Sequence, residues 1–256
     1  MLVKKVLLAS IITLSLTTAN ARPLSEIETS GILKVGVPGD YAPLAFYKND
    51  VLVGYDVDVA TALAKEWNLK LEFVATSWPT LSEDLEADKF DIAMGGISFT
   101  QDRNDRFLLT KPLIPDGKVA MAQCEKAPNL KTVEAINQPS TVVAVNPGGT
   151  NERFVNAHLD KATIVRTPNN IENIQMVREK TADMIITDMI EGNYYHHNEP
   201  ANFCVANDKP FEGTENSQIY MSQKGNVELV KKLNGWLTLN NLASIADQWG
   251  IQLNKE

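Results

Sequence analysis

Short apolar runs alternate with amphipathic stretches along most of the chain, and the whole pattern occurs twice. In the first half, ILKVGV, LKLEFVA and DIAMGGISF read as strands, and GYDVDVATALAKEWN and TLSEDLEADKF between them carry apolar residues at helical spacing. In the second half, TVVAV, KATIVRTP and ADMIITD repeat the strand pattern, again with helical stretches between them. Strand–helix–strand order is typical of a parallel sheet with right-handed crossovers. The pattern therefore predicts two α/β lobes.

The end of the chain indicates how the two lobes are connected. A late strand, NSQIYMSQ, is followed by two helices in NVELVKKLNGWLTLNNLASIADQWG, and these helices need a sheet to pack on. We therefore expect the second lobe to be inserted into the first. The predicted units are a signal peptide (1–21), a first lobe (22–115), an inserted second lobe (116–207) and a return to the first lobe (208–256). Ligands of such folds bind beyond the carboxyl ends of the strands, so we expect a cleft between the lobes.

The first residues read as a secretory signal peptide. MLVKK is positively charged, VLLASIITLSLTT is an apolar run of thirteen residues, and ANA ending at Ala21 fits a small-residue cleavage site. The run is too short to span a membrane as a helix, and no later stretch reaches eighteen apolar residues. No cysteine follows it to accept lipid. We therefore expect a soluble mature protein outside the cytoplasm, which in a Gram-negative cell means the periplasm.

Charge and cysteine content narrow the classes of function. Cleavage after Ala21 removes Lys4 and Lys5, so 22 basic residues face 32 acidic ones and the net charge falls from −8 to −10. Such an acidic chain is poorly suited to bind nucleic acid or anionic lipid. In an oxidising compartment, Cys124 and Cys204 favour one disulfide, and their spacing fits no zinc motif. We expect no metal and no cofactor, and the oligomeric state is not readable from the sequence.

Two Gly-containing segments are candidate anion-binding loops, one in each lobe. MGGISFTQDR delivers Ser98 and Arg103 into a loop after a strand, and the planar fork of arginine suits a carboxylate, although a loop arginine is also commonly solvated. NPGGTNERF places Thr150 and Asn151 at the start of a helix, where backbone N–H groups form an anion site. The alternative there is a turn in which threonine or asparagine only caps the helix. Together the two loops favour an anionic ligand.

Aromatic and hydroxyl side chains follow the first two strands. Thr76, Ser77 and Trp78 come directly after LKLEFVA, and Tyr41 and Phe46 lie in the loop after ILKVGV. Tryptophan most often packs in a core. At the carboxyl end of a strand, beside hydroxyl groups, Trp78 could equally form the wall of a ring-sized pocket.

The segment TDMIEGNYYHH, beginning at Thr187, allows two interpretations. Asp188 and Glu191 have the spacing of a capping box, in which Asp188 accepts from the third N–H of the helix and Glu191 reaches back to the N–H of Asp188. This interpretation accounts for both residues without any function. The other interpretation is that Glu191 turns from the helix end into the cleft and acts chemically.

Taken together, GDYAPLAF, GYDVDVATALAKEW, FDIAMGGISFTQDR, GGTNE and IITD resemble the periplasmic solute-binding proteins for polar amino acids, over nearly the whole mature chain. The resemblance implies a two-lobed fold of type II, with two crossing strands and hinge closure on the ligand. It implies that Arg103 clamps the α-carboxylate of the ligand and that Thr150 and Asn151 support it from the other lobe. It also implies that Trp78 or its neighbour packs on the ligand side chain, and that Asp188 holds the α-ammonium group.

Within that superfamily, ATSWPTL, FDIAMGGIS, VNPGGTNE and TDMIE resemble an enzymatic branch, the periplasmic cyclohexadienyl dehydratases, and Cys124 and Cys204 fall where that branch has a pair. The branch converts prephenate to phenylpyruvate and L-arogenate to L-phenylalanine with loss of water and carbon dioxide. The resemblance implies a carbon–oxygen lyase with Glu191 as general acid. GDYAPLAF and GNYYHH depart from the pattern of the branch, which leaves the choice between prephenate and arogenate open. Thr76, Ser77 and Asn151 are candidates to hold the ring carboxylate.

The competing class is a non-catalytic amino-acid-binding protein of an ABC transporter. Such a protein needs Arg103 and Asp188 but has no use for a carboxylic acid in the cleft. If Glu191 is an acid, its pKa must be raised. Burial, Asp188 and a dianionic substrate act in that direction, and the helix N-terminus, worth about 0.3–1 kcal/mol, opposes them.

Overall fold

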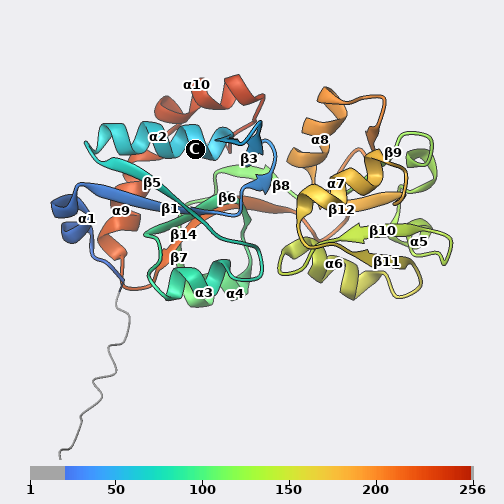
Figure 1. The fold of residues 1–256 in the computed structure, drawn as a ribbon, viewed down its shortest axis with the longest axis horizontal. Helices are drawn as coiled ribbons and strands as arrows, with labels where there is room; N and C mark the ends of the chain where they lie inside the picture. Colours follow the sequence, from blue (N-terminus) through green and yellow to red (C-terminus); the bar gives the residue numbers. More distant parts are fainter. Residues whose placement is uncertain (1–20, 255–256) are drawn as a thin grey trace, which may run out of the picture.

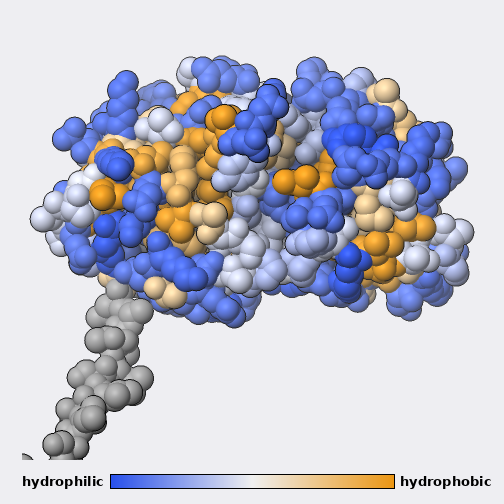
Figure 2. Space-filling view, in the orientation of Figure 1, coloured by the Kyte–Doolittle hydropathy of each residue, from blue (hydrophilic) through white to orange (hydrophobic). Residues whose placement is uncertain are grey.

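The structure is a computed structural model that describes residues 21–254, so the predicted signal peptide lies outside the described residues apart from Ala21. Two lobes lie side by side, each with a central sheet and helices on both of its faces (Figure 1). Hydrophilic residues cover most of the outer rim of both lobes, and apolar residues show between them in the middle of the face drawn (Figure 2). Within residues 21–254, no helix is both long and apolar enough to cross a membrane.

The first lobe is built on a sheet with the strand order β5-β1-β6-β14-β7, on which β8 also pairs with β14. The strands are β1 (Ile32–Val37), β5 (Lys70–Ala75), β6 (Ile92–Ser98), β7 (Phe107–Leu109), β8 (Ile114–Asp116) and β14 (Asn216–Gln223). β1 runs parallel to β5 and β6, whereas β14 runs antiparallel to β6. A small antiparallel sheet packs beside it and consists of β2 (Asp40–Tyr41), β3 (Ala45–Lys48) and β4 (Val51–Val53).

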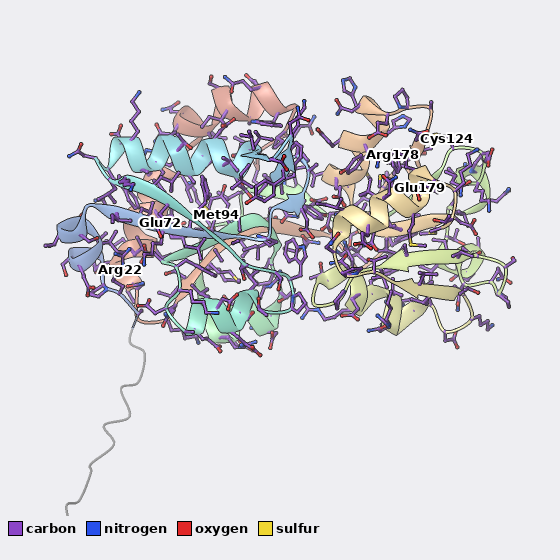
Figure 3. The ribbon with its side chains drawn as sticks, viewed as in Figure 1. Arg22, Glu72, Met94, Cys124, Arg178 and Glu179 are labelled. Carbon is purple, nitrogen blue, oxygen red and sulfur yellow. A yellow bond between two sulfur atoms is a disulfide. The ribbon has the colours of Figure 1, made fainter. Side chains whose placement is uncertain are left out.

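Helices surround the sheet of the first lobe. They are α1 (Leu24–Ser30), α2 (Tyr55–Glu66), α3 (Leu81–Glu86), α4 (Gln101–Arg106), α9 (Val227–Trp236) and α10 (Leu239–Trp249). α2 covers one face of the sheet with α10 packed on it, α3 and α4 cover the other face, and α1 and α9 lie at the end away from the second lobe (Figure 1). Met94 of β6 is fully buried in the core between these layers (Figure 3).

The second lobe is built on a sheet with the strand order β11-β10-β12-β9-β13. The strands are β9 (Lys118–Gln123), β10 (Val142–Val145), β11 (Thr163–Arg166), β12 (Met184–Asp188) and β13 (Phe203–Val205). β10 runs parallel to β11 and β12, and β9 runs antiparallel to β12. The helices are η1 (Ala127–Asn129), α5 (Val133–Ile136), α6 (Thr150–His158), α7 (Asn170–Arg178) and α8 (Met189–Asn198). α6 covers one face of this sheet, and α7 and α8 cover the other (Figure 1).

The chain crosses between the lobes twice. It leaves the first sheet at the end of β8 (Ile114–Asp116) and enters the second with β9, which begins at Lys118. It returns after β13 through residues 206–215 to β14. The predicted limits of the lobes, after residues 115 and 207, stay predictions.

The strands and helices expected from periodicity are confirmed, but two regions were assigned wrongly. The segment LLTKPLIPDGKVAMAQC, expected as a long connection, holds β7, β8 and the central strand β9, and the loop containing Tyr41 and Phe46 is the small antiparallel sheet. Both were missed because strands of two to four residues have no measurable period, and because β9 is buried throughout and shows no alternation.

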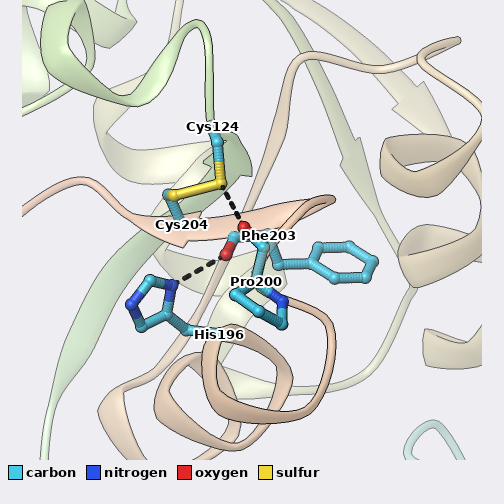
Figure 4. The surroundings of a disulfide bond; sticks show 5 residues. All are labelled: Cys124, His196, Pro200, Phe203 and Cys204. Carbon is cyan, nitrogen blue, oxygen red and sulfur yellow. Dashed lines mark hydrogen bonds between the residues drawn. A yellow bond between two sulfur atoms is a disulfide. The ribbon is translucent and has the colours of Figure 1, made fainter.

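The predicted disulfide between Cys124 and Cys204 is present and joins the end of β9 to the edge strand β13 (Figure 4). A second contact beside the disulfide links β13 to α8: the carbonyl oxygen of Phe203 lies 2.9 Å from Nδ1 of His196, near the end of α8 (Figure 4). Because the bond closes a chain segment with a sequence separation of 80, it restricts the unfolded chain and stabilises the second lobe by roughly 4 kcal/mol in the chain-entropy account.

Candidate functional site

A small cavity of about 20 Å³, enough for about one water molecule, lies between the two lobes, which are closed on each other. The first lobe contributes Tyr41, Trp78, Gly96, Ser98 and Arg103 to the lining, and the second lobe contributes Asn146, Gly149, Thr150, Asn151, Asn170 and Asp188. The lining comes from the carboxyl ends of strands and from helix N-termini, as the strand order predicts.

Arg103 is buried at the cavity wall, with 7% of its surface exposed. It belongs to the short helix α4 and not to a loop, because Thr100 caps that helix by accepting a hydrogen bond from the Arg103 N–H at 3.3 Å. Arg103 Nη1 also donates to the Ser98 carbonyl oxygen at 2.5 Å. Burial, and then the charge of Arg153, lower the pKa of Arg103 to about 10. The guanidinium therefore keeps its charge at neutral pH and offers a desolvated cation to an anionic ligand.

Lys118 is a site residue that the sequence did not reveal. It is the first residue of β9, is 4% exposed, and donates from Nζ to Thr150 Oγ1 at 2.7 Å, Asn151 Oδ1 at 2.5 Å and Asp188 Oδ1 at 2.7 Å. A lysine between a Gly and an apolar strand, as in DGKVAMAQ, normally lies in solvent. The one available signal is that the strand it begins is apolar on both faces, which puts its neighbours in the interior.

Asp188 is the N-cap residue of α8, but its side chain makes no capping hydrogen bond, so the capping-box prediction is wrong. Its carboxylate pairs with Lys118 and accepts a hydrogen bond from the Tyr41 hydroxyl at 2.9 Å. The first N–H groups of α8 bond to the crossing segment instead: Met189 N donates to the Gly117 carbonyl at 2.9 Å, and Ile190 N donates to Asp116 at 3.3 Å. A buried cation holds Asp188 away from the helix end.

Thr150 and Asn151 lie at the start of α6, as predicted, and line the cavity. Neither caps the helix. The N-cap residue is Gly149, and the hydroxyl of Thr150 and the amide oxygen of Asn151 both accept hydrogen bonds from Lys118. The helix N-terminus therefore faces the cavity with its N–H groups, next to a buried ammonium group, which is an arrangement suited to an anion.

The aromatic wall of the cavity consists of Trp78 and Tyr41. Their rings meet edge to face with centroids 5.8 Å apart, and Trp78 Nε1 donates to Asp40 at 2.8 Å. Gly96, with φ 93°, allows this packing because a Cβ atom there would lie 2.5 Å from the Tyr41 ring. Two predicted residues lie elsewhere: the lining does not include Thr76 or Ser77, whose hydroxyls bond Asp84 and Thr80 on α3 and its N-cap.

Glu191 is completely buried on the first turn of α8. Its Oε1 accepts a hydrogen bond from Asn170 Nδ2 at 2.7 Å, and its Oε2 lies 2.5 Å from Thr187 Oγ1. It therefore does not bond back to the N–H of Asp188. The chemical interpretation expected Glu191 to line the cavity, but it does not. The lining includes Asn170, which bonds Glu191, and Tyr41, which contacts Thr187.

Burial raises the pKa of Glu191 well above its usual 4.5. Hydrogen bonds from Thr187 and Asn170 oppose the rise, and the negative charges of Asp40 and Asp188 add to it. This direction is the one required of a proton donor at neutral pH. The raised pKa also means that ionising Glu191 works against folding.

Asp116, at the crossing between the lobes, is a second buried carboxyl group that the sequence did not single out. It accepts hydrogen bonds from the Gln218 side chain at 3.0 Å and from the Gly117 N–H at 2.9 Å. Burial, and then the charge of Asp188, raise the pKa of Asp116 to about 7. In the part of the chain that the structure describes, no group of three or more His, Cys, Asp or Glu side chains could hold a metal ion.

The raised pKa of Glu191 predicts a pH-dependent effect on stability. Above pH 4.5 the unfolded chain loses the proton that the native state still holds, so stability falls as pH rises, by about 1.4 kcal/mol per pH unit, until the folded-state pKa is passed. Glu191→Gln has no such loss. We expect its melting temperature to match wild type at pH 4.5 and to exceed it by several degrees at pH 8, at about 2–4 °C per kcal/mol. Scanning calorimetry at both pH values tests this, and a constant difference would contradict it.

The chain resembles known proteins over most of its length. The profile of the bacterial extracellular solute-binding proteins, family 3, matches residues 33–250. A cyclohexadienyl dehydratase of Pseudomonas aeruginosa is 37% identical over 213 residues, which make up 83% of this chain and 79% of that protein. The L-cystine-binding protein TcyA of Bacillus subtilis is 27% identical over 233 residues, or 88% of this chain and 83% of that protein.

Solved structures show the same two kinds of relative. The crystal structure of an ancestral amino-acid-binding protein, described as a precursor of cyclohexadienyl dehydratase, superposes with a TM-score of 0.80 at 31% identity and covers 88% of this chain and 98% of that one. The predicted two-lobed α/β fold of type II is thereby confirmed. The similarities extend both to an enzyme and to amino-acid-binding proteins.

Proposed function

The chain belongs to the bacterial extracellular solute-binding proteins of family 3, and from this premise we propose that it is a cyclohexadienyl dehydratase rather than a transport receptor. In this proposal the protein removes water and carbon dioxide from prephenate to give phenylpyruvate, and from L-arogenate to give L-phenylalanine. The observation that carries the proposal is the carboxyl group of Glu191, which is wholly buried, has a raised pKa and accepts a hydrogen bond from Asn170, a residue that lines the cavity together with the cation of Arg103. A receptor for amino acids gains nothing from such an acid.

The reaction requires little from the protein apart from one proton and a fixed geometry. Glu191 is the source of a proton that passes through the hydroxyl groups of Thr187 and Tyr41 to the ring hydroxyl of the substrate. Each hydroxyl takes one proton and gives up another, the C–O bond breaks, and water leaves. The bond from the ring to its carboxylate breaks at the same time, and its electron pair completes the aromatic ring as carbon dioxide departs. Glu191 is left as a carboxylate and takes its next proton from solvent. General acid catalysis of this kind contributes typically about 10²–10⁴-fold.

The other residues bind and orient the substrate. Arg103 from the first lobe and the N-terminus of α6 from the second supply donors for the two carboxylates. Lys118 adds positive charge behind Thr150 and Asn151, which accept its hydrogen bonds. Trp78 packs on the ring. Because Thr76 and Ser77 do not line the cavity, we no longer assign them to the ring carboxylate. Fixing a ring against a proton donor in this way supplies several kcal/mol of the rate enhancement.

The pairing of Asp188 with Lys118 bears on the choice of substrate. If the chain were an amino-acid receptor, the carboxylate of Asp188 would have to be free to accept the ammonium group of the ligand. In the structure it accepts hydrogen bonds from Lys118 Nζ at 2.7 Å and from the Tyr41 hydroxyl at 2.9 Å. Arogenate carries an ammonium group where prephenate has a keto oxygen. A second ammonium group beside Lys118 is repelled in a buried site, where charges are poorly screened. We therefore propose that prephenate is preferred.

The proposed location is the periplasm. The predicted signal peptide directs export, and the family is one of extracellular solute-binding proteins. The expected partner is the small-molecule substrate alone, since a net charge of −10 after cleavage disfavours nucleic acid and anionic membranes.

Incubation with prephenate tests the proposed function. Phenylpyruvate is followed by its absorbance in base, with a protein-free control because prephenate aromatises by itself in acid. A parallel thermal-shift screen measures binding of lysine, arginine, glutamine and cystine. We expect turnover of prephenate, slower turnover of arogenate, and no stabilisation by the amino acids. A large shift with one amino acid and no turnover would establish the receptor instead, which is the function of several relatives.

A further inference from the structure

One residue of the first lobe, Asp40, contacts the second lobe directly behind the cavity. It lies in β2, and it accepts the backbone N–H of Asn170 on Oδ2 at 3.0 Å. Its backbone carbonyl accepts Asn170 Nδ2 at 3.1 Å, and its Oδ1 accepts the indole N–H of Trp78 at 2.8 Å. Asp40 therefore connects the aromatic wall of the cavity to the first residue of α7 in the other lobe.

Asn170 passes this contact on to Glu191. Its side chain is 1% exposed, and the two hydrogens of its Nδ2 have two acceptors, the carbonyl oxygen of Asp40 and Glu191 Oε1. Its Oδ1 accepts from Asn173 Nδ2 at 3.3 Å. Since both neighbours of Nδ2 are acceptors and the neighbour of Oδ1 is a donor, the amide has one orientation.

The orientation of this amide determines where the proton of Glu191 resides. An N–H donor pairs with the unprotonated oxygen of a carboxyl group, so Oε1 is the carbonyl oxygen and the proton is on Oε2. Oε2 lies 2.5 Å from Thr187 Oγ1, and that hydroxyl can accept as well as donate. Thr187 Oγ1 is in turn 3.3 Å from the hydroxyl of Tyr41, which lines the cavity. The protonated oxygen is therefore the one on the side of Tyr41.

We propose that Asp40 is a positioning residue that completes the acid when the two lobes close, by holding Asn170 so that the proton of Glu191 resides on Oε2. The inference rests on the role proposed above for Glu191. Two-lobed binding folds open and close about their crossing strands. When the lobes separate, Asp40 leaves Asn170, the amide becomes free to turn, and water reaches Glu191. Glu191 is therefore a buried acid with its proton on Oε2 only when the lobes are closed on a substrate.

The charges around Glu191 support this role. After burial, the charge of Asp40 is the largest contribution that raises the pKa of Glu191, ahead of that of Asp188. Removing Asp40 from its vicinity therefore lowers that pKa. The other titratable or charged groups that face Glu191 belong to the elements packed around it and are Tyr41 on β2, Tyr195 on α8, and Lys118 on β9 through its ion pair with Asp188.

Asp40→Asn tests the inference, because it keeps the shape of the side chain and removes its charge and one acceptor. The protonated carboxyl group of Glu191 gives an infrared band that is identified by its absence in Glu191→Gln. We expect this band to titrate at lower pH in Asp40→Asn than in wild type. The loss of kcat/KM should therefore be larger at high pH than at pH 5.5, by up to about ten-fold for each unit by which the pKa falls. An unchanged infrared titration would overturn the inference.

A matched control and a second variant separate positioning from general damage. Asp58 on α2 accepts the indole N–H of Trp249 at 2.7 Å, as Asp40 accepts that of Trp78, but lies away from the cavity; Asp58→Asn should behave as wild type. Asn170→Leu removes the donor to Oε1, so the infrared band should titrate at higher pH while kcat falls at every pH. If the band in Asn170→Leu titrated as in wild type, Asn170 would not hold Oε1 of Glu191, and Asp40 could not act through it.

The infrared titration needs no turnover, so the two proposals can fail separately. If wild type does not convert prephenate, the proposed function fails, and the titration still decides whether Asp40 acts on Glu191. If wild type converts prephenate and Asp40→Asn shows wild-type titration and pH–rate profiles, only the role of Asp40 fails.

Discussion

Glu191→Gln is expected to lower kcat for prephenate by about 10²–10⁴-fold while the protein stays folded and binds substrate. Glutamine keeps an oxygen for the Asn170 N–H at the Oε1 position and an N–H for Thr187 at the Oε2 position, so the contacts of the buried side chain survive. What it lacks is a transferable proton. The loss should therefore fall on kcat, with the dissociation constant of prephenate, measured by calorimetry, changed only slightly.

A control for this variant lies at the other end of the same helix. Glu199 follows α8 and accepts two hydrogen bonds from Arg178, each of 2.8 Å, on the outer part of the second lobe. Glu199→Gln makes the same chemical change away from the cavity and should keep the wild-type rate. If Glu191→Gln retained near-wild-type kcat, the assignment of the general acid would be wrong, and the buried carboxyl group would be structural.

Lys118→Met is expected to cause the largest loss of stability among substitutions in the site. It leaves Asp188 buried without its cation, and breaking a buried pair in this way costs about 3–5 kcal/mol, on the order of 10 °C in melting temperature for a chain of this size. It should also change ligand preference. With Lys118 gone, the ammonium group of arogenate can pair with Asp188, so the ratio of kcat/KM for arogenate to that for prephenate should rise by at least about ten-fold, or 1.4 kcal/mol.

Two further variants test the reason for this effect. Lys126 also pairs with an aspartate, Asp183, but 46% of its side chain is exposed, so Lys126→Met should cost no more than about 1 kcal/mol. The double variant Lys118→Met/Asp188→Asn removes both charges. It should regain most of the lost stability but none of the preference for arogenate. If Lys118→Met kept the wild-type substrate ratio, Asp188 would not be the partner that decides between keto and amino groups.

Much of the site was visible in the sequence because its residues follow recognisable strands. Ser98 ends β6, Trp78 follows β5, and Thr150 begins α6, and these positions converge wherever parallel strands end at one edge. Their roles as ligand-binding residues stay proposals. The resemblance to family 3 solute-binding proteins, read from short segments in their order, is confirmed by the match over residues 33–250.

Lys118 and Asn170 were among the residues missed, because local sequence offered a simpler account of each. Lys118 precedes an apolar strand and reads as a solvated end. Asn170 follows another asparagine at a helix start, and a cap accounts for such a pair; in the structure Asn169 is the cap, accepting the Glu172 N–H at 3.0 Å, and Asn170 bonds Asp40 and Glu191. Asp188 was misread for the same reason. A capping box is defined by four residues, and Lys118, which overrides it, is 70 positions away.

The sequence by itself correctly indicated the two α/β lobes, the disulfide and the family, because hydrophobic periodicity and short motifs can be recognised without knowledge of contacts. The export signal that it also indicated stays a prediction. Tertiary structure alone decided the electrostatics of the site. Lys118 neutralises Asp188, and Asn170 and Asp40 lie beside Glu191, only because the fold brings β2, α7, β9 and α8 together and buries these side chains. Burial gives those charges their strength, and burial is a property of the assembled fold.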